Sequence, residues 1–143
     1  MSSGTHAKTL QLALAAEHAA IYGYGVVGAH LSGAQRRYAA TADAAHRARR
    51  DQLRELLVER GATPVAAAAA YRLPAVVVSG ADAVELAVTL EERLASVWVT
   101  AVGDLTGALR ALAARAVQDC AVRAAVWRGS STALPGLRRH DRP

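Results

Sequence analysis

The sequence predicts an all-α protein of four long helices, arranged as two antiparallel hairpins that are joined by a long crossover. Apolar residues recur at spacings of three and four in four stretches of similar length, which is the pattern of amphipathic helices. The breaks between these stretches are short, long and short in chain order. Alanine, the strongest helix former, makes up about a quarter of the 143 residues. These three observations together define the fold class.

The first hairpin is predicted to span residues 5–60. Its first helix begins near Thr5, a plausible N-cap, and carries one apolar stripe from Leu10 to Leu31. A Ser-Gly turn at 32–33 separates it from the second helix, expected over 34–60. Gly61, followed by Pro64, is a strong signal for the end of that helix.

The second hairpin follows a connection of about twenty residues, 61–81, which we expect to be extended chain laid along the bundle. Asp82 and Glu85 read as a capping box that opens the third helix. A break at 103–107 precedes the fourth helix, expected to end near Trp127. One long crossover between two hairpins is the ferritin-like arrangement. We therefore assign residues 1–128 to a ferritin-like four-helix bundle and 129–143 to a flexible C-terminal tail.

Composition narrows the class of protein further. The formal net charge is +5, and almost all the basic residues are arginine, a bias that GC-rich codon usage also produces. The single cysteine permits no disulfide within the chain, and we see no signal peptide or membrane span. We expect a cytoplasmic protein without a membrane partner. The arginines of the second helix allow binding of nucleic acid or another anion as an alternative function, although nearby acidic residues balance much of their charge.

Each helix places one ionisable residue in the middle of its apolar stripe: Glu17, His46, Glu91 and Asp119. We count the residues that separate each position from the nearest turn and take about 1.5 Å of rise per residue. All four residues then lie at a similar height along the bundle axis. Buried charges are costly unless they are paired or bind a metal ion, so this convergence predicts a polar site at mid-bundle.

Two interpretations of that site are open. Ferritin-like di-metal proteins use a glutamate from each of two helices and a Glu-x-x-His from each of the other two. Here Glu17, Asp43, His46 and Glu91 could be ligands, for iron or manganese, but the fourth helix has Val122 and Arg123 where a histidine motif would continue. We favour a buried polar network without a cofactor, formed by Glu17, His46, Arg50, Glu91, Glu92, Asp119 and Arg123.

Four segments resemble a known family: AEHAAIYGYG at 16–25, HRARRD at 46–51, AYRLP at 70–74 and LEE at 90–92. With these motifs in this order, the chain is similar to a small ferritin-like domain of unknown function that is common in high-GC bacteria. The resemblance extends from about Leu10 to Trp127 and implies the ferritin-like fold, without an established activity. It also implies that Glu17, His46 and the Glu91–Glu92 pair are the recurrent motif positions, and it leaves open which glutamate of the pair faces inward.

The glycines at 23, 25 and 28 match the GxGxxG pattern of dinucleotide-binding loops, but no strand precedes them and they lie within a helical stripe. We therefore expect close helix packing there and no nucleotide-binding residues. The function we favour is that of a binding or structural module, acting as a homodimer, with an incomplete di-metal site and no enzymatic activity. A metal-dependent oxidoreductase or iron-binding protein with a reduced carboxylate and histidine site is the alternative.

Overall fold

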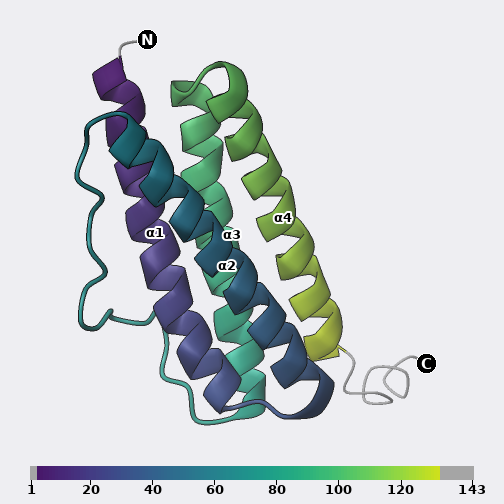
Figure 1. Ribbon diagram of the computed structural model, residues 1–143. Helices are drawn as coiled ribbons and strands as arrows, with labels where there is room; N and C mark the ends of the chain where they lie inside the picture. The colour runs from purple at the N-terminus through teal and green to yellow at the C-terminus, as the bar shows by residue number, and fades with distance from the viewer. Residues whose placement is uncertain (1–2, 133–143) are drawn as a thin grey trace.

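The computed structural model describes residues 3–132 as four helices and their connections (Figure 1). In chain order they are α1 (Ser3–Ala29), α2 (Gly33–Glu59), α3 (Gly80–Asp104) and α4 (Gly107–Thr132). The expected all-α class and the two hairpins with one crossover are confirmed. α4 continues past its expected end into the first residues assigned to the tail, and residues 133–143 of that tail lie outside the described part of the chain.

The helix ends are set by local hydrogen bonds. α2 ends in a Schellman motif, in which the Gly61 amide donates to the Val58 carbonyl (2.9 Å) and the Ala62 amide donates to the Leu57 carbonyl (3.0 Å). Gly61 has a φ of +73°, a conformation that glycine adopts without the steric penalty of a Cβ atom. The capping box of α3 is formed by Ser79 and Asp82, three residues upstream of the expected pair. Ser79 takes this role because its hydroxyl can accept the Asp82 amide while its own amide reaches the Asp82 carboxylate.

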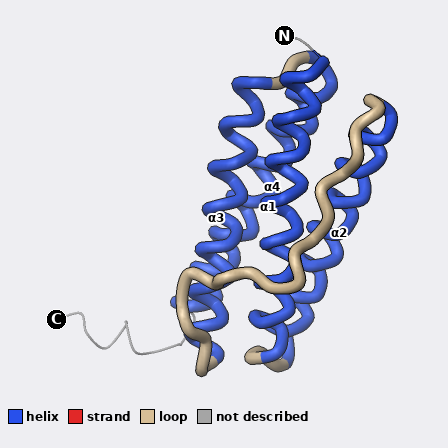
Figure 2. Tube along the Cα trace, turned by 90° about the vertical axis from the view of Figure 1, so that its left-hand side faces the viewer, coloured by secondary structure: helices blue, strands red, loops and turns tan. Residues whose placement is uncertain are grey.

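The crossover, residues 60–79, carries the chain from one end of the bundle to the other (Figure 2). The side-chain amide of Gln11, on α1, anchors the start of the crossover with two hydrogen bonds. Its Nε2 donates to the Thr63 carbonyl (2.7 Å), and its Oε1 accepts from the Val65 amide (2.8 Å). Nε2 of His18 lies 3.0 Å from the Val65 carbonyl, so this buried histidine is a second anchor of the crossover. Further along, the rings of Tyr22 and Tyr71 pack at 5.5 Å. Side chains of α1 thus hold the extended backbone, which has no neighbouring strand.

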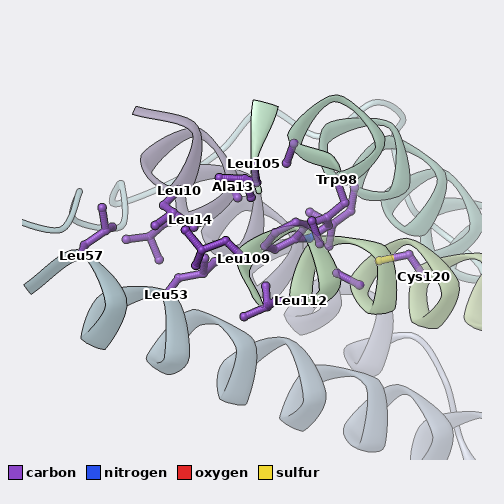
Figure 3. Close-up of a cluster of buried hydrophobic side chains, with 14 of the residues drawn as sticks. Leu10, Ala13, Leu14, Leu53, Leu57, Trp98, Leu105, Leu109, Leu112 and Cys120 are labelled. Atoms are coloured by element: carbon purple, nitrogen blue, oxygen red, sulfur yellow. The ribbon is translucent and has the colours of Figure 1, made fainter. Parts of the chain in front are cut away.

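The apolar core consists of two clusters at opposite ends of the bundle. One cluster contains Trp98 and leucines from each of the four helices, among them Leu10, Leu14, Leu109 and Leu112 (Figure 3). The other is built around Tyr24, Val27 and Trp127. The polar site lies between them, because Glu17, His46 and Glu91 occupy the helix turns that separate the two clusters.

The buried face of α4 differs from the expected stripe in its second half. Leu109, Leu112 and Ala116 are buried, and the buried face continues through Cys120 and Trp127, while Asp119, which was expected inside, is exposed. A strict alternation of three and four drifts across the surface of a straight helix, which has 3.6 residues per turn. The drift moves Asp119 from the core to the edge of α4 that faces α2.

Gly23 is the point where α1 and α3 approach most closely among the three glycines of the GxGxxG match. A Cβ atom at Gly23 would lie 2.6 Å from Leu90 Cδ1, whereas a Cβ atom at Gly25 or Gly28 would meet nothing within 4 Å. Gly23 therefore allows the close packing of α1 against α3, as expected. Gly25 makes no such contact, so an alanine at that position would favour the helix without a steric clash.

We expect opposite results from alanine at these two positions. Gly25→Ala should raise the free energy of unfolding by about 0.5–1 kcal/mol, because it adds helix propensity at an exposed site. Gly23→Ala should leave the protein about 1–3 kcal/mol less stable than Gly25→Ala, because buried Leu90 must move. Chemical denaturation of both variants measures the difference, and equal stabilities would contradict the close packing.

Candidate functional site

The centre of the bundle is occupied by the imidazole of His46, which lies between two carboxylates. His46 Nδ1 is 2.8 Å from Glu17 Oε2 on α1, and Nε2 is 2.6 Å from Glu91 Oε1 on α3. All three side chains are buried, none with more than 1% of its surface exposed. Since each ring nitrogen has a carboxylate oxygen as its partner, both nitrogens can donate only when the ring is the charged imidazolium.

The two carboxylates are each satisfied by a further donor. The indole Nε1 of Trp98 donates to Glu17 Oε1 at 3.1 Å. The Nε of Arg123, from α4, donates to Glu91 at 2.8 and 3.2 Å from its two oxygens. All four helices therefore contribute to one network, which we call the central network: Glu17, His46, Glu91, Trp98 and Arg123.

Charge in the central network is balanced. Two carboxylates face one imidazolium and one guanidinium, which is the condition under which ionised groups can be buried without a large unpaired charge. Burial by itself lowers the pKa of His46, because the charged ring loses its hydration. The hydrogen bonds and negative charges of Glu17 and Glu91 outweigh this and raise the pKa to about 9. His46 is therefore charged at neutral pH.

Aromatic side chains enclose the network toward the second cluster. The ring of Tyr24 lies 5.5 Å from that of His46, and the Tyr24 hydroxyl accepts a hydrogen bond from Trp127 Nε1 at 3.0 Å. Burial and, secondarily, the charge of Glu91 raise the pKa of Tyr24 far above its usual range, so its hydroxyl stays protonated. Cys120 is buried nearby on α4, and burial raises the pKa of its thiol to about 12, which leaves it without nucleophilic character.

A surface ion pair covers the network on the side of α2 and α4. Arg49 Nη2 lies 2.8 Å from Asp119 Oδ2, joining the two helices across a groove that both of them line. The guanidinium of Arg49 also lies 5.8 Å from the centre of the Trp98 ring, within the range of a cation–π contact. The sequence contained some indication of this contact, because Arg49 and Trp98 both lie on the inward stripes of their helices. It did not predict that Arg49 would cover the central network.

Three residues expected in the buried network lie outside it. Asp119 is half-exposed and binds Arg49, because the drift of the α4 stripe turns it outward, while Arg123, expected in the same network, does bind Glu91. Arg50 binds its neighbour Asp51 at the surface. Glu92 is half-exposed and pairs with Arg128, so Glu91 is the inward member of the glutamate pair.

Asp43, expected as a metal ligand in one interpretation, pairs with Arg47 and makes no hydrogen bond to His46 among the described residues. Its Oδ2 accepts a hydrogen bond from Arg47 Nε at 2.8 Å, one turn along α2. This pair, together with the Arg50–Asp51 pair, neutralises part of the basic face of α2. The structure thus brings together Glu17, His46 and Glu91 of the four expected ligands, and leaves Asp43 apart.

The residues present do not fit a two-metal centre. Within residues 3–132, no group of three or more histidine, cysteine or acidic side chains is arranged to hold a metal ion. Both nitrogens of His46 are engaged by carboxylates, one from α1 and one from α3. The guanidinium of Arg123 occupies the fourth side of the site and would repel a second cation.

Comparison with solved structures places the fold among ferritin-like bundles. A ferritin-like, diiron-carboxylate protein from Bacillus anthracis str. Ames superposes with a TM-score of 0.61 at 18% sequence identity, over 92% of this chain and 95% of that one. A likeness at this identity shows the shared fold alone. The class is therefore an all-α ferritin-like four-helix bundle.

Within that class, the chain belongs to the family described as a domain of unknown function, DUF4439, whose model matches residues 9–139. A conserved hypothetical protein from Mycobacterium tuberculosis, rv2844, is 40% identical and superposes with a TM-score of 0.88, over 94% of this chain and 96% of that one. The expected resemblance to a ferritin-like domain family of unknown function is thus confirmed. No curated protein matches the chain. None of the four described helices is long and apolar enough to cross a membrane.

The two adjacent glutamates offer a matched test of the central network. Glu91→Gln should lower the free energy of unfolding by about 2–4 kcal/mol, because it removes one charge from a buried, balanced group. Glu92→Gln removes a half-exposed surface pair and should change stability by less than about 0.5 kcal/mol. Urea denaturation distinguishes the two, and similar losses for both variants would contradict the network.

Stability should also depend on the proton of His46. Its pKa is raised to about 9 in the folded chain from an ordinary value of 6.5, so the folded state binds the proton more tightly than the unfolded state does. The stabilisation is complete below about pH 6.5 and should decrease by roughly 2–4 kcal/mol as the pH rises to 9.

Denaturation curves between pH 6 and 9 measure this loss. The range ends there because the thiol of unfolded Cys120, with an ordinary pKa of 9.0, is half ionised at pH 9 and would add its own pH dependence above it. In His46→Gln the same interval should be nearly flat, since the titrating group is gone. A slope that persists in the variant would assign the effect to other groups.

Proposed function

We propose that this protein is a binding or structural module in which an ion-pair network replaces the di-metal centre of its fold class. The observation that carries the proposal is the position of His46, whose two nitrogens face Glu17 and Glu91 while Arg123 neutralises the remaining negative charge. In this arrangement the imidazolium and the guanidinium supply the positive charge that a metal ion would otherwise supply to the carboxylates.

The role of the network in such a module is to fix the helices relative to one another. A buried hydrogen-bonded charge tolerates displacement poorly, because a partner that moves leaves the other charge unpaired in a low-dielectric interior. Glu17, His46, Glu91 and Arg123 come from four different helices, so a slide of any one of them by a turn would separate at least one pair. A rigid bundle of this kind presents its outer faces at constant geometry, which suits binding more than redox chemistry.

Metal analysis tests the proposal directly. Protein purified without a chelator or a metal-affinity step should contain far less than one iron, manganese or zinc per chain, and incubation with Fe(II) or Mn(II) followed by gel filtration should not raise that content. The thermal unfolding temperature should be unchanged by the same ions, because a ligand that binds only the folded state would raise it.

Glu17→Gln and Glu92→Gln are the matched variants for this measurement. Stoichiometric metal that is lost in Glu17→Gln and retained in Glu92→Gln would overturn the proposal. It would favour the metal-dependent alternative with ligands from the central network. Metal that both variants retain would point to binding elsewhere on the chain and leave the network without a metal role.

A further inference from the structure

A small apolar pocket lies beneath the second half of the crossover, apart from the central network. It has a volume of about 130 Å³ and is enclosed by α1, α3 and residues 71–74. Its α3 wall is formed by Leu90, Leu94 and Val97. Its α1 wall consists of three alanines, at 16, 19 and 20, whose short side chains leave the space open.

The roof of the pocket is held in place by contacts at Tyr71. The Tyr71 ring packs against Tyr22 of α1, and its hydroxyl accepts a hydrogen bond from the Ala68 amide at 2.8 Å. The crossover turns partway along its length and passes over α1 toward α3 (Figure 2). The pocket is therefore formed by fixed parts of the fold, and a ligand would not have to order the segment that covers it.

Two arginines line the pocket, and neither has an acidic partner. Arg72 lies in the roof and Arg93 on α3, and both side chains are exposed. Among the described residues neither makes an ion pair or hydrogen bond, whereas Arg47, Arg49 and Arg123 each bind a carboxylate of the chain. None of the residues between 3 and 132 that line the pocket is acidic. An apolar space with two unpaired guanidinium groups is complementary to a molecule that has an apolar body and an anionic end.

The size of the pocket sets the size of that body. An engineered protein cavity of about 150 Å³ with aliphatic walls accommodates a benzene ring. At about 130 Å³, this pocket suits one ring or a branched aliphatic chain of similar bulk. Guanidinium groups bind carboxylates through paired hydrogen bonds of matching geometry, which defines the anionic end.

We propose that this pocket is a binding site for small apolar carboxylates. The apolar body packs against Leu90, Leu94 and Val97, and the carboxylate binds Arg72 and Arg93. The site deepens the binding role proposed above, and it is independent of the central network and of its metal content. If small carboxylates do not bind in the pocket, the proposal about the ion-pair network still stands, because metal analysis tests that proposal separately.

A methyl NMR titration with benzoate tests the site. Benzoate should shift the methyl signals of Leu90, Leu94 and Val97 in a saturable manner, and benzyl alcohol, which has the ring without the charge, should bind more weakly. In the double variant Arg72→Gln with Arg93→Gln, benzoate affinity should fall roughly tenfold, the range expected on losing hydrogen bonds between charged groups. The matched control is Arg36→Gln with Arg37→Gln, two exposed arginines of α2, which should bind as the unaltered protein does.

Ala19→Leu provides a second test, because a leucine side chain on the α1 wall fills the pocket without removing a charge. It should abolish the shifts while leaving the methyl signals of the cluster around Leu10 and Leu14 in place, which shows that the variant is folded. The proposal is overturned if benzoate gives no saturable shifts in the pocket, or if the paired arginine variants bind alike. It is equally overturned if benzyl alcohol binds as well as benzoate, or if Ala19→Leu leaves binding unchanged.

Discussion

The protonation of His46, whose two N–H groups each donate to one carboxylate, Glu17 and Glu91, is the interaction on which the arrangement of the bundle depends. Without it, two carboxylates would be buried at the level where the four helices meet, with only Arg123 to balance them. Burial of an unpaired charge is among the most unfavourable changes in a protein interior. With the proton, the polar layer becomes neutral and hydrogen-bonded, and the apolar clusters above and below it can form in register. The aromatic side chains of Tyr24 and Trp98 complete this layer by excluding water from the charged groups.

The crossover shapes the molecule as strongly as the helices do. Because it runs the length of α1, it makes α2 and α3 parallel and places α1 against both of them (Figure 1). Its anchors on α1, Gln11, His18 and Tyr22, follow one another along the helix at positions facing the same side. The connection therefore covers a helix face that would otherwise be exposed, and it creates the pocket where it leaves α1 for α3.

The fold could be predicted from the sequence because hydrophobic periodicity, glycine and proline stops and connection lengths all indicated the same topology. The inward positions of Glu17, His46 and Glu91 followed from the same periodicity, since each lies at the centre of a long and regular stripe. Prediction failed for Asp119 on α4, where a shift of one residue decides whether Asp119 or Cys120 turns inward. It also failed for Asp43 and Arg50, whose nearest partners lie on their own helix. The spacing of residues alone does not show whether a charged side chain pairs within its own helix or with a residue of another helix.

The order of charges along the chain gives the central network a further property. The inward ionisable residues alternate as acid, base, acid, base: Glu17, His46, Glu91 and Arg123. Each helical hairpin thus carries one negative and one positive group at mid-height, and these two inward charges balance each other within the hairpin. Two such halves can meet during folding without either presenting an uncompensated charge to the other. The polar layer is then completed when Glu91, which also binds Arg123, pairs with His46 from the opposite hairpin, so assembly does not have to wait for an external ion.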